Sequence, residues 1–240
     1  MVIYGGRDDI NNVAITFDDG PNPEYTPKIL KVLKDKKVKA TFFLIGKNAE
    51  KYPSVVKQII EEGHDVGNHT YAHENLKDNA DNHKLVQEEL QKGAEAIKKV
   101  TGISNKELKF FRPPGLAWDE KVENIVKPFY GNRVIMSEIG FDDWNWDDSK
   151  QWDQKDTNTI SNKTSQIIDG VKSKVQNGSI IALHDSAQYG LEEPLAHPNW
   201  TKRAIPTFQA LPVIIDYLHS RGFSIVKLSQ MDLIEEPVRV

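Results

Sequence analysis

The sequence predicts an α/β fold, a barrel of about seven or eight βα units, from two observations. Short apolar or β-branched runs alternate along the 240 residues with amphipathic stretches rich in lysine and glutamate, and this alternation is typical of parallel βα units. No linker rich in Pro, Gly or Ser and no shift in composition divides the chain, so residues 1–240 are expected to form one domain. An open doubly wound sheet is the alternative arrangement.

The expected strands are the apolar runs, at 13–17, 40–45, 64–68, 108–112, 132–139, 179–184 and 223–228. Helices are expected between them, at 26–36, 53–62, 82–100, 119–126, 158–176 and 205–221. Pro27 and Pro53 fall where a first helical turn accepts proline, and Gly102 follows a helix where a left-handed residue is favoured. Segments 140–157 and 186–204 exceed ordinary connections, so they are expected to be functional or disordered.

The composition excludes several classes of partner and chemistry. With 31 basic and 35 acidic residues the net charge is -4, so bulk charge would not hold a nucleic acid, and a neutral or weakly charged partner is favoured. Cysteine is absent, which rules out disulfides, thiolate ligands and a cysteine nucleophile. No run of about 18 apolar residues is present, so no membrane segment is expected in this chain.

The first strand candidate ends on two adjacent carboxylates, Asp18 and Asp19, in the stretch TFDDGP. Neighbouring strand residues point to opposite faces, so two buried mid-strand charges would cost several kcal/mol, roughly, in desolvation. The following Gly-Pro is a strong turn signal. Both carboxylates are therefore expected at the carboxyl end of the strand, where βα barrels carry their active sites.

Polar residues also follow three other strand candidates: His69 with His73, then Arg112, then His184. Two histidines four residues apart would lie on one side of a helical turn. With a carboxylate, assigned here to Asp19, they form a familiar ligand set for a divalent metal, most often Zn²⁺, with Co²⁺, Ni²⁺ and Mn²⁺ as alternatives.

The remaining polar residues at these strand ends suggest a hydrolytic site. Asp18 is then free to act as a general base, and Arg112 can hold it ionised and oriented. Pro113 and Pro114 favour a rigid turn that directs the backbone N–H of Gly115 towards a developing oxyanion. His184 would protonate a leaving group from the opposite side. A base, an acid and a metal between them describe hydrolysis of an amide or an ester.

The motifs TFDDGP, HTYAH, RPP and LHD, in this order, resemble those of the NodB-like polysaccharide deacetylases of carbohydrate esterase family four. The resemblance extends from about residue 12 to residue 233. It implies a distorted (β/α) barrel of about seven strands and metal-dependent removal of acetyl groups from sugar polymers. It also implies the same roles for Asp18, Asp19, His69, His73, Arg112 and His184.

Two positions depart from the family pattern. Gly115 stands where the family usually has a tyrosine. Gln151, in the stretch DSKQW from Asp148 to Trp152, replaces the aspartate that tunes the acid histidine. Glutamine can hydrogen-bond an imidazole but cannot stabilise imidazolium, so impaired or shifted acid catalysis is expected. Asp148 and its neighbour Asp147 are candidate substitutes.

Aromatic residues suggest a carbohydrate groove, with Trp118 and Trp146 as candidate sugar platforms. Trp152 and Leu183 match family positions that line the acetyl pocket. The leading hypothesis is an N-deacetylase of N-acetylglucosamine units in peptidoglycan or chitin-type oligomers. The alternatives are an acetylxylan esterase and a catalytically silent carbohydrate-binding relative. Such substrates imply an extracellular or envelope location, with a cytoplasmic one left open, and the sequence does not decide the oligomeric state.

Overall fold

The computed structural model describes residues 1–104, 107–137, 139–140, 157–186 and 204–237. Residues 141–156 and 187–203, which make up most of the two long connections, lie outside the described residues. Within the described part, the strands form one parallel sheet and one separate antiparallel pair. The strands are β1 (Val2–Gly6), β2 (Asn12–Asp18), β3 (Thr41–Leu44), β4 (Asp65–Asn68), β5 (Ile139–Gly140), β6 (Ile180–His184), β7 (Ser224–Val226) and β8 (Leu233–Glu236).

The parallel sheet has the order β4-β3-β2-β6-β5, and β7 pairs with the first half of β2. Single parallel bridges continue it from Asn68 to Phe111 and from Phe111 to Val134, shortly before β5. The sheet therefore curls back on itself as a distorted barrel, which confirms the expected fold class. The expected strands at 108–112 and 132–139 are reduced mainly to these bridges. Pro113 and Pro114 have no N–H to extend a ladder beyond Arg112.

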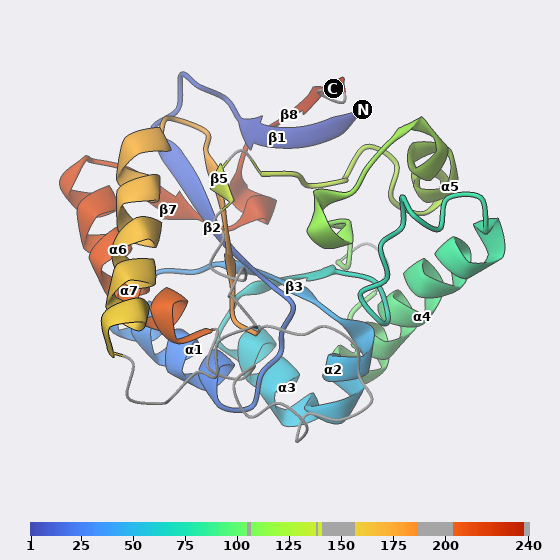
Figure 1. The fold of residues 1–240 in the computed structure, drawn as a ribbon, viewed down its shortest axis with the longest axis horizontal. Helices are drawn as coiled ribbons and strands as arrows, with labels where there is room; N and C mark the ends of the chain where they lie inside the picture. Colours follow the sequence, from blue (N-terminus) through green and yellow to red (C-terminus); the bar gives the residue numbers. More distant parts are fainter. Residues whose placement is uncertain (105–106, 138, 141–156, 187–203, 238–240) are drawn as a thin grey trace.

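Helices cover the outside of the barrel at positions close to those expected. They are α1 (Tyr25–Asp35), α2 (Gly46–Lys51), α3 (Pro53–Glu61), α4 (His83–Thr101), α5 (Glu120–Tyr130), α6 (Thr157–Lys174) and α7 (Ala204–Ser220), with short 3-10 turns at Pro114–Leu116 and Leu228–Gln230. In Figure 1, α6 and α7 stand side by side at one end, and α4 and α5 at the other. Asn82 caps α4 by accepting a hydrogen bond from Leu85 N–H, and left-handed Gly102 ends it.

The core has two layers that follow the alternation of strand side chains. Phe17 and Leu183 belong to the cluster between sheet and helices, whereas Ala14 and Ile180 belong to a cluster on the inner face. Because successive strand residues point to opposite faces, Asp18 shares the inner face with Ala14. Burial of the strand core thus directs the polar end of β2 into the mouth of the barrel.

The antiparallel pair of β1 and β8 joins the first and the last strand of the chain, with Val2 opposite Glu236 (Figure 1). The sequence reading did not anticipate this pair, because both segments are short and lie outside the βα alternation. Among the described residues, no helix is both long and apolar enough to cross a membrane.

Candidate functional site

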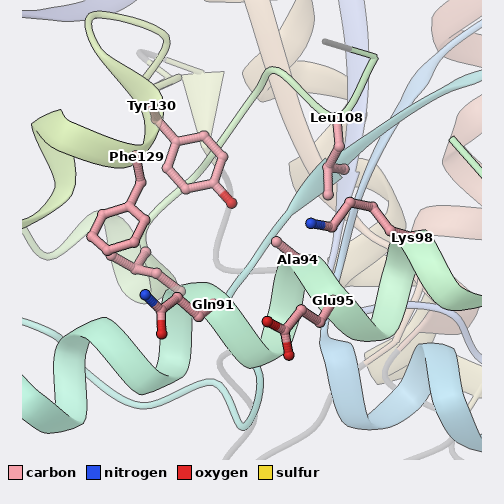
Figure 2. A pocket seen from close by; sticks show the side chains of 8 residues that line it. Gln91, Ala94, Glu95, Lys98, Leu108, Phe129 and Tyr130 are labelled. Carbon is pink, nitrogen blue, oxygen red and sulfur yellow. The ribbon is translucent and has the colours of Figure 1, made fainter. Parts of the chain in front are cut away.

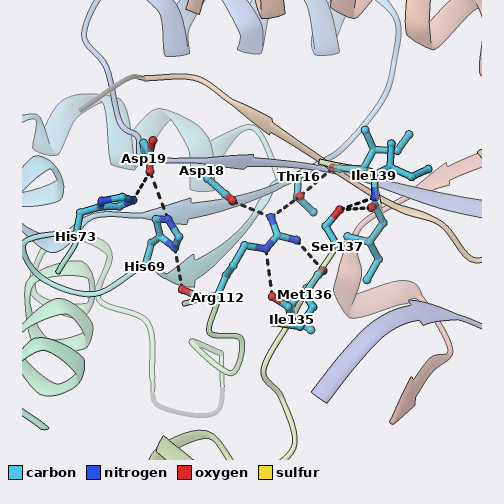
Figure 3. Close-up of polar contacts among 12 residues, drawn as sticks. Thr16, Asp18, Asp19, His69, His73, Arg112, Ile135, Met136, Ser137 and Ile139 are labelled. Atoms are coloured by element: carbon cyan, nitrogen blue, oxygen red, sulfur yellow. Dashed lines mark hydrogen bonds and ion pairs between the residues drawn. The ribbon is translucent and has the colours of Figure 1, made fainter. Parts of the chain in front are cut away.

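The carboxyl ends of β2, β4 and β6 bring the predicted residues together (Figure 3). Asp18 ends β2 and pairs in register with His184, which ends β6. His69 follows β4, and its backbone N–H donates to Leu44 O at the end of β3. The predicted positions on separate strands are therefore adjacent because the parallel register aligns the strand ends.

Asp18 is held by Arg112, as the sequence predicted. The guanidinium Nη1 lies 2.7 Å from Asp18 Oδ1, and the arginine is fully buried. The same nitrogen donates to Thr16 Oγ1 at 2.7 Å, and Nε and Nη2 donate to the carbonyls of Ile135 and Met136. Four acceptors thus fix the guanidinium, which in turn fixes the carboxylate of Asp18.

Asp19 lies in a turn whose backbone is tied to α2. Its φ is 73°, a left-handed conformation that is uncommon for a residue other than glycine. Asn48 Nδ2 donates to Asp19 O at 2.9 Å, and Ile45 N–H donates to Gly20 O at 2.9 Å. These bonds point the side chain of Asp19 away from that of Asp18, so the two carboxylates face different partners.

Three ligand-type side chains meet at Asp19. Its Oδ1 lies 3.3 Å from His69 Nε2 and 3.1 Å from His73 Nε2. One ligand atom from each of the three residues falls within 4.8 Å of the others. All three side chains are largely buried, and Figure 3 shows both imidazoles directed at the carboxylate.

The chemistry of this cluster fits a divalent cation. His69 Nδ1 lies 2.8 Å from the carbonyl of Arg112, which can only accept, so Nδ1 carries a proton and an unprotonated Nε2 would turn its lone pair towards Asp19. Among the described residues, Asp19 Oδ1 is a buried acceptor with no well-formed hydrogen bond, although both Nε2 atoms lie close to it. A lone pair facing a buried carboxylate is unfavourable unless a cation lies between them. Two imidazole nitrogens and a carboxylate oxygen are a ligand set that zinc accepts.

The charges of the cluster are mutually dependent. Burial alone would raise the pKa of Asp19, but His73 and His69 outweigh it and hold that pKa below its usual value. Burial alone would lower the pKa of His73, yet Asp19 raises it above the ordinary value. Without a cation, the buried carboxylate therefore favours protonation of His73, and a metal ion would compete with that proton.

The predicted helical turn between the two histidines is wrong. Residues 69–73 form a bend rather than a helix, with Thr70 at φ 66° and His73 at φ 64°. Thr70 Oγ1 accepts a hydrogen bond from His73 N–H at 3.0 Å. Two left-handed residues, rather than a 3.6-residue period, bring the imidazoles to one side.

The carboxylate of Asp185 packs against Gly20, which directly follows Asp18 and Asp19. The sequence alone did not suggest a role for Asp185. Thr26 donates to Asp185 Oδ2 at 2.5 Å, while Oδ1 is buried and has no donor within the part of the chain that the structure describes. Burial raises the pKa of Asp185 to about 7, with the negative charges of Asp19 and Asp18 adding to it. Thr16, in contrast, could have been found from sequence, because strand alternation puts it on the face of Asp18.

Two of the predicted substrate contacts are not supported. Leu183 is fully buried in the cluster between sheet and helices, on the opposite face from His184, because adjacent strand residues alternate. Trp118 is 7% exposed and packs in a core cluster with Phe111 and Val122, so its faces are used in packing. Pro114 is buried, whereas Gly115 is exposed at φ 60° with open space around its Cα. Asp148, Gln151, Trp152 and Trp146 lie outside the described residues.

A pocket of about 210 Å³ lies on the outside of the barrel, between α4 and the end of α5 (Figure 2). Its wall includes Phe129, Tyr130 and Lys98, but no residue of the Asp19 cluster. The Tyr130 hydroxyl accepts a hydrogen bond from Asn68, which precedes His69. This pocket is therefore separate from the candidate site, although one of its walls supports the strand that carries the site.

The fold and the site define a barrel with a buried Asp-His-His cluster that could hold a metal ion, and a buried Asp18–Arg112 ion pair, at its strand ends. A family model described as polysaccharide deacetylase matches residues 5–131. A chitooligosaccharide deacetylase of Azorhizobium caulinodans is 31% identical over 221 residues, which cover 91% of this chain and 93% of that protein. The chain therefore belongs to the polysaccharide deacetylase family, the hydrolases of carbohydrate esterase family four.

Further relatives and solved structures agree with this assignment. A peptidoglycan-N-acetylglucosamine deacetylase of Bacillus cereus is 44% identical over 135 residues, which cover 56% of this chain and 46% of that protein. The structure of the Bc1960 peptidoglycan N-acetylglucosamine deacetylase is 31% identical and superposes with a TM-score of 0.74, covering 96% of this chain and 92% of that one. A mutant of BA3943, described as a CE4 family pseudoenzyme with restored activity, is 26% identical with a TM-score of 0.73, covering 96% of this chain and 71% of that one.

Proposed function

We propose that this protein is a metal-dependent hydrolase that removes N-acetyl groups from N-acetylglucosamine units of peptidoglycan or chitin-type oligomers. One observation carries the proposal: two adjacent carboxylates have different partners. Asp18 is paired with buried Arg112, and Asp19 faces two imidazoles. A base and a metal ligand are the two functions that amide hydrolysis requires from such a pair.

Asp18 takes a proton from the water that attacks the acetyl carbonyl carbon. Arg112 keeps this carboxylate aimed, because the pair is buried and four acceptors fix the guanidinium. His184, on the neighbouring strand end, donates a proton to the amide nitrogen as the C–N bond breaks. The products are acetate and a free amine on the sugar.

Asp19, His69 and His73 would hold the divalent cation. When bound, such a cation polarises the carbonyl as a Lewis acid and lowers the pKa of water. Zn²⁺ suits two nitrogens and one oxygen best, and Co²⁺, Ni²⁺ and Mn²⁺ accept the same ligands. The backbone N–H of Gly115, after Pro114, is a candidate second donor to the oxyanion.

The substrate assignment is supported by the names of the relatives, which act on peptidoglycan N-acetylglucosamine or chitooligosaccharides. Polymers of this kind lie outside the cytoplasm, so we place the protein at the cell envelope or beyond it. Trp146 and Trp152 as sugar contacts, and Gln151 with Asp148 as the groups that tune His184, are proposed on the sequence alone.

An acetylxylan esterase is the second candidate. The Xyl-CE4 domain of a multidomain xylanase superposes with a TM-score of 0.70 at 27% identity, covering 92% of this chain and 89% of that one. An ester uses the same base and cation, but its alkoxide leaving group differs from an amine in its need for a proton from His184. The weakened partner at Gln151 therefore affects the ester reaction differently from the amide reaction.

Acetate release from chitopentaose, peptidoglycan and acetylated xylan, measured in parallel, separates these candidates. Each reaction is run with added Zn²⁺ or Co²⁺ and with a chelator. Chelator-sensitive release from the N-acetylglucosamine polymers is expected. Release from xylan alone would transfer the assignment to an esterase, and no release with bound metal would indicate a catalytically silent relative.

A further inference from the structure

The loop between the two histidines adopts a conformation that its own residues do not favour. Thr70 and His73 both have positive φ, which non-glycine residues adopt only when their surroundings impose it. This conformation places His73 Nε2 at 3.1 Å from Asp19 Oδ1. Contacts outside the loop must therefore hold the cluster in its cation-binding shape.

Glu89, on the buried face of α4, provides such a contact. Its Oε2 accepts hydrogen bonds from the backbone N–H groups of Tyr71 at 3.1 Å and Ala72 at 2.8 Å. The side chain is buried, at 7% exposure, and among the described residues no Lys or Arg forms an ion pair with it. A buried carboxylate whose bonds go to two consecutive loop amides is arranged to fix that loop.

The opposite side of the loop is closed by backbone contacts. Gly46 N–H donates to Thr70 O at 2.9 Å, and Lys47 N–H donates to Tyr71 O at 3.0 Å, both from the start of α2. On α4, a Cβ at Gly93 would come within 2.8 Å of Thr70 O. The loop is thus enclosed between α2 and α4, and Glu89 is the charged side chain of α4 that binds its amides.

We infer that Glu89 is a positioning residue of the metal site, which acts by holding the loop that carries His69 and His73. This inference rests on the proposed metal-dependent function. Removal of the carboxylate leaves two loop amides without acceptors, so the loop relaxes from its left-handed conformation. His73 then no longer faces Asp19 in the geometry that a cation needs.

The test compares Glu89→Ala, Glu89→Gln and a matched control, Glu88→Gln, for binding of Co²⁺ and Zn²⁺ to the metal-free protein by calorimetry. Glu88 is the adjacent residue on α4, but its side chain is 42% exposed and pairs with Lys92. Glu89→Ala is expected to weaken metal binding by about 10–100-fold. Glu89→Gln is expected to stay within about threefold, because one amide oxygen can accept both bonds as Oε2 does, and Glu88→Gln is expected to equal the wild type.

Two further readouts separate positioning from a general packing role. The visible spectrum of bound Co²⁺ should change in Glu89→Ala, while thermal unfolding of the metal-free variant stays cooperative. If Glu89→Ala does not fold, Glu89→Asp takes its place, because its shorter side chain withdraws the acceptor from the loop. Wild-type metal affinity in Glu89→Ala, or in Glu89→Asp where it takes that place, would overturn the inference. Equal losses of metal affinity in Glu89→Gln and Glu89→Ala would overturn it as well. Failure of the wild-type protein to bind metal would instead overturn the proposed function.

Discussion

Replacement of Arg112 by methionine tests how much the buried ion pair between Arg112 and Asp18 contributes to stability. Arg112 is fully buried and donates to Asp18, Thr16 and two backbone carbonyls. Methionine preserves much of the volume over the Phe43 ring, which lies 4.3 Å from the guanidinium carbon, but it donates no hydrogen bond. The variant therefore leaves the buried carboxylate of Asp18 without its counter-charge.

Removal of one partner from a buried ion pair costs about 3–5 kcal/mol. We expect Arg112→Met to lose this amount of unfolding free energy, measured by urea denaturation of the chelated protein at pH 7. Arg133→Met is the matched control: Arg133 is exposed, and its replacement should change stability by less than about 0.5 kcal/mol. Adding Asp18→Asn to Arg112→Met removes the unpaired charge, so the double variant should recover part of the loss. A cost below about 1 kcal/mol for Arg112→Met would refute the reasoning.

Two further predictions concern other parts of the barrel. Burial lowers the pKa of His64 from 6.5 to about 4. Below pH 6.5 the unfolded chain binds a proton that the folded protein does not bind until about pH 4, so the stability is complete above pH 6.5 and falls as the pH falls. The loss of unfolding free energy at pH 5 is about 2 kcal/mol. His64→Gln keeps an acceptor for Ala40 N–H and should remove this acid-dependent loss of stability, measured by urea denaturation at pH 7 and pH 5. An unchanged pH dependence in the variant would contradict this prediction. A Cβ at Gly20 would overlap both carboxylate oxygens of Asp185, so Gly20→Ala should cost about 1–3 kcal/mol through overpacking. The control is Gly115→Ala, at φ 60° in open space, which should cost only about 1 kcal/mol. Equal unfolding free energies in Gly20→Ala and Gly115→Ala would refute the predicted clash with Asp185.

The sequence was most informative where a periodic pattern and burial agree. The strands β2, β3 and β6 are mainly apolar runs, and the parallel register of β2 and β6 places Asp18 beside His184. Asp18 and His184 could be placed because they end such strands, and His69 and Arg112 because they follow or end the expected strands at 64–68 and 108–112. The pair of β1 and β8 was missed, because the two segments gain their stability from each other across the whole chain.

The details of the site depend on contacts that local sequence does not encode. The spacing of His69 and His73 suggested a helical turn. Instead, loop N–H groups donate to Thr70 and Glu89, and N–H groups of α2 donate to the loop, and these bonds hold it in left-handed conformations. Nothing near Glu89 in the sequence distinguishes it from Glu88, because only the fold brings it to the loop. Leu183 as a wall of the acetyl pocket stays a prediction, and strand alternation buries its side chain on the face of β6 opposite His184.

Turnover of chitopentaose by Asp18→Asn, with the metal site saturated, tests the central claim most directly. Asp18→Asn keeps the shape of the side chain and the metal ligands Asp19, His69 and His73, but it cannot accept the proton from water. We expect binding of Co²⁺ within about threefold of the wild type and a loss of about 10²–10⁴-fold in kcat. Wild-type turnover with metal bound would contradict the assignment of Asp18 as the base, and with it the account of how this site hydrolyses an acetyl group.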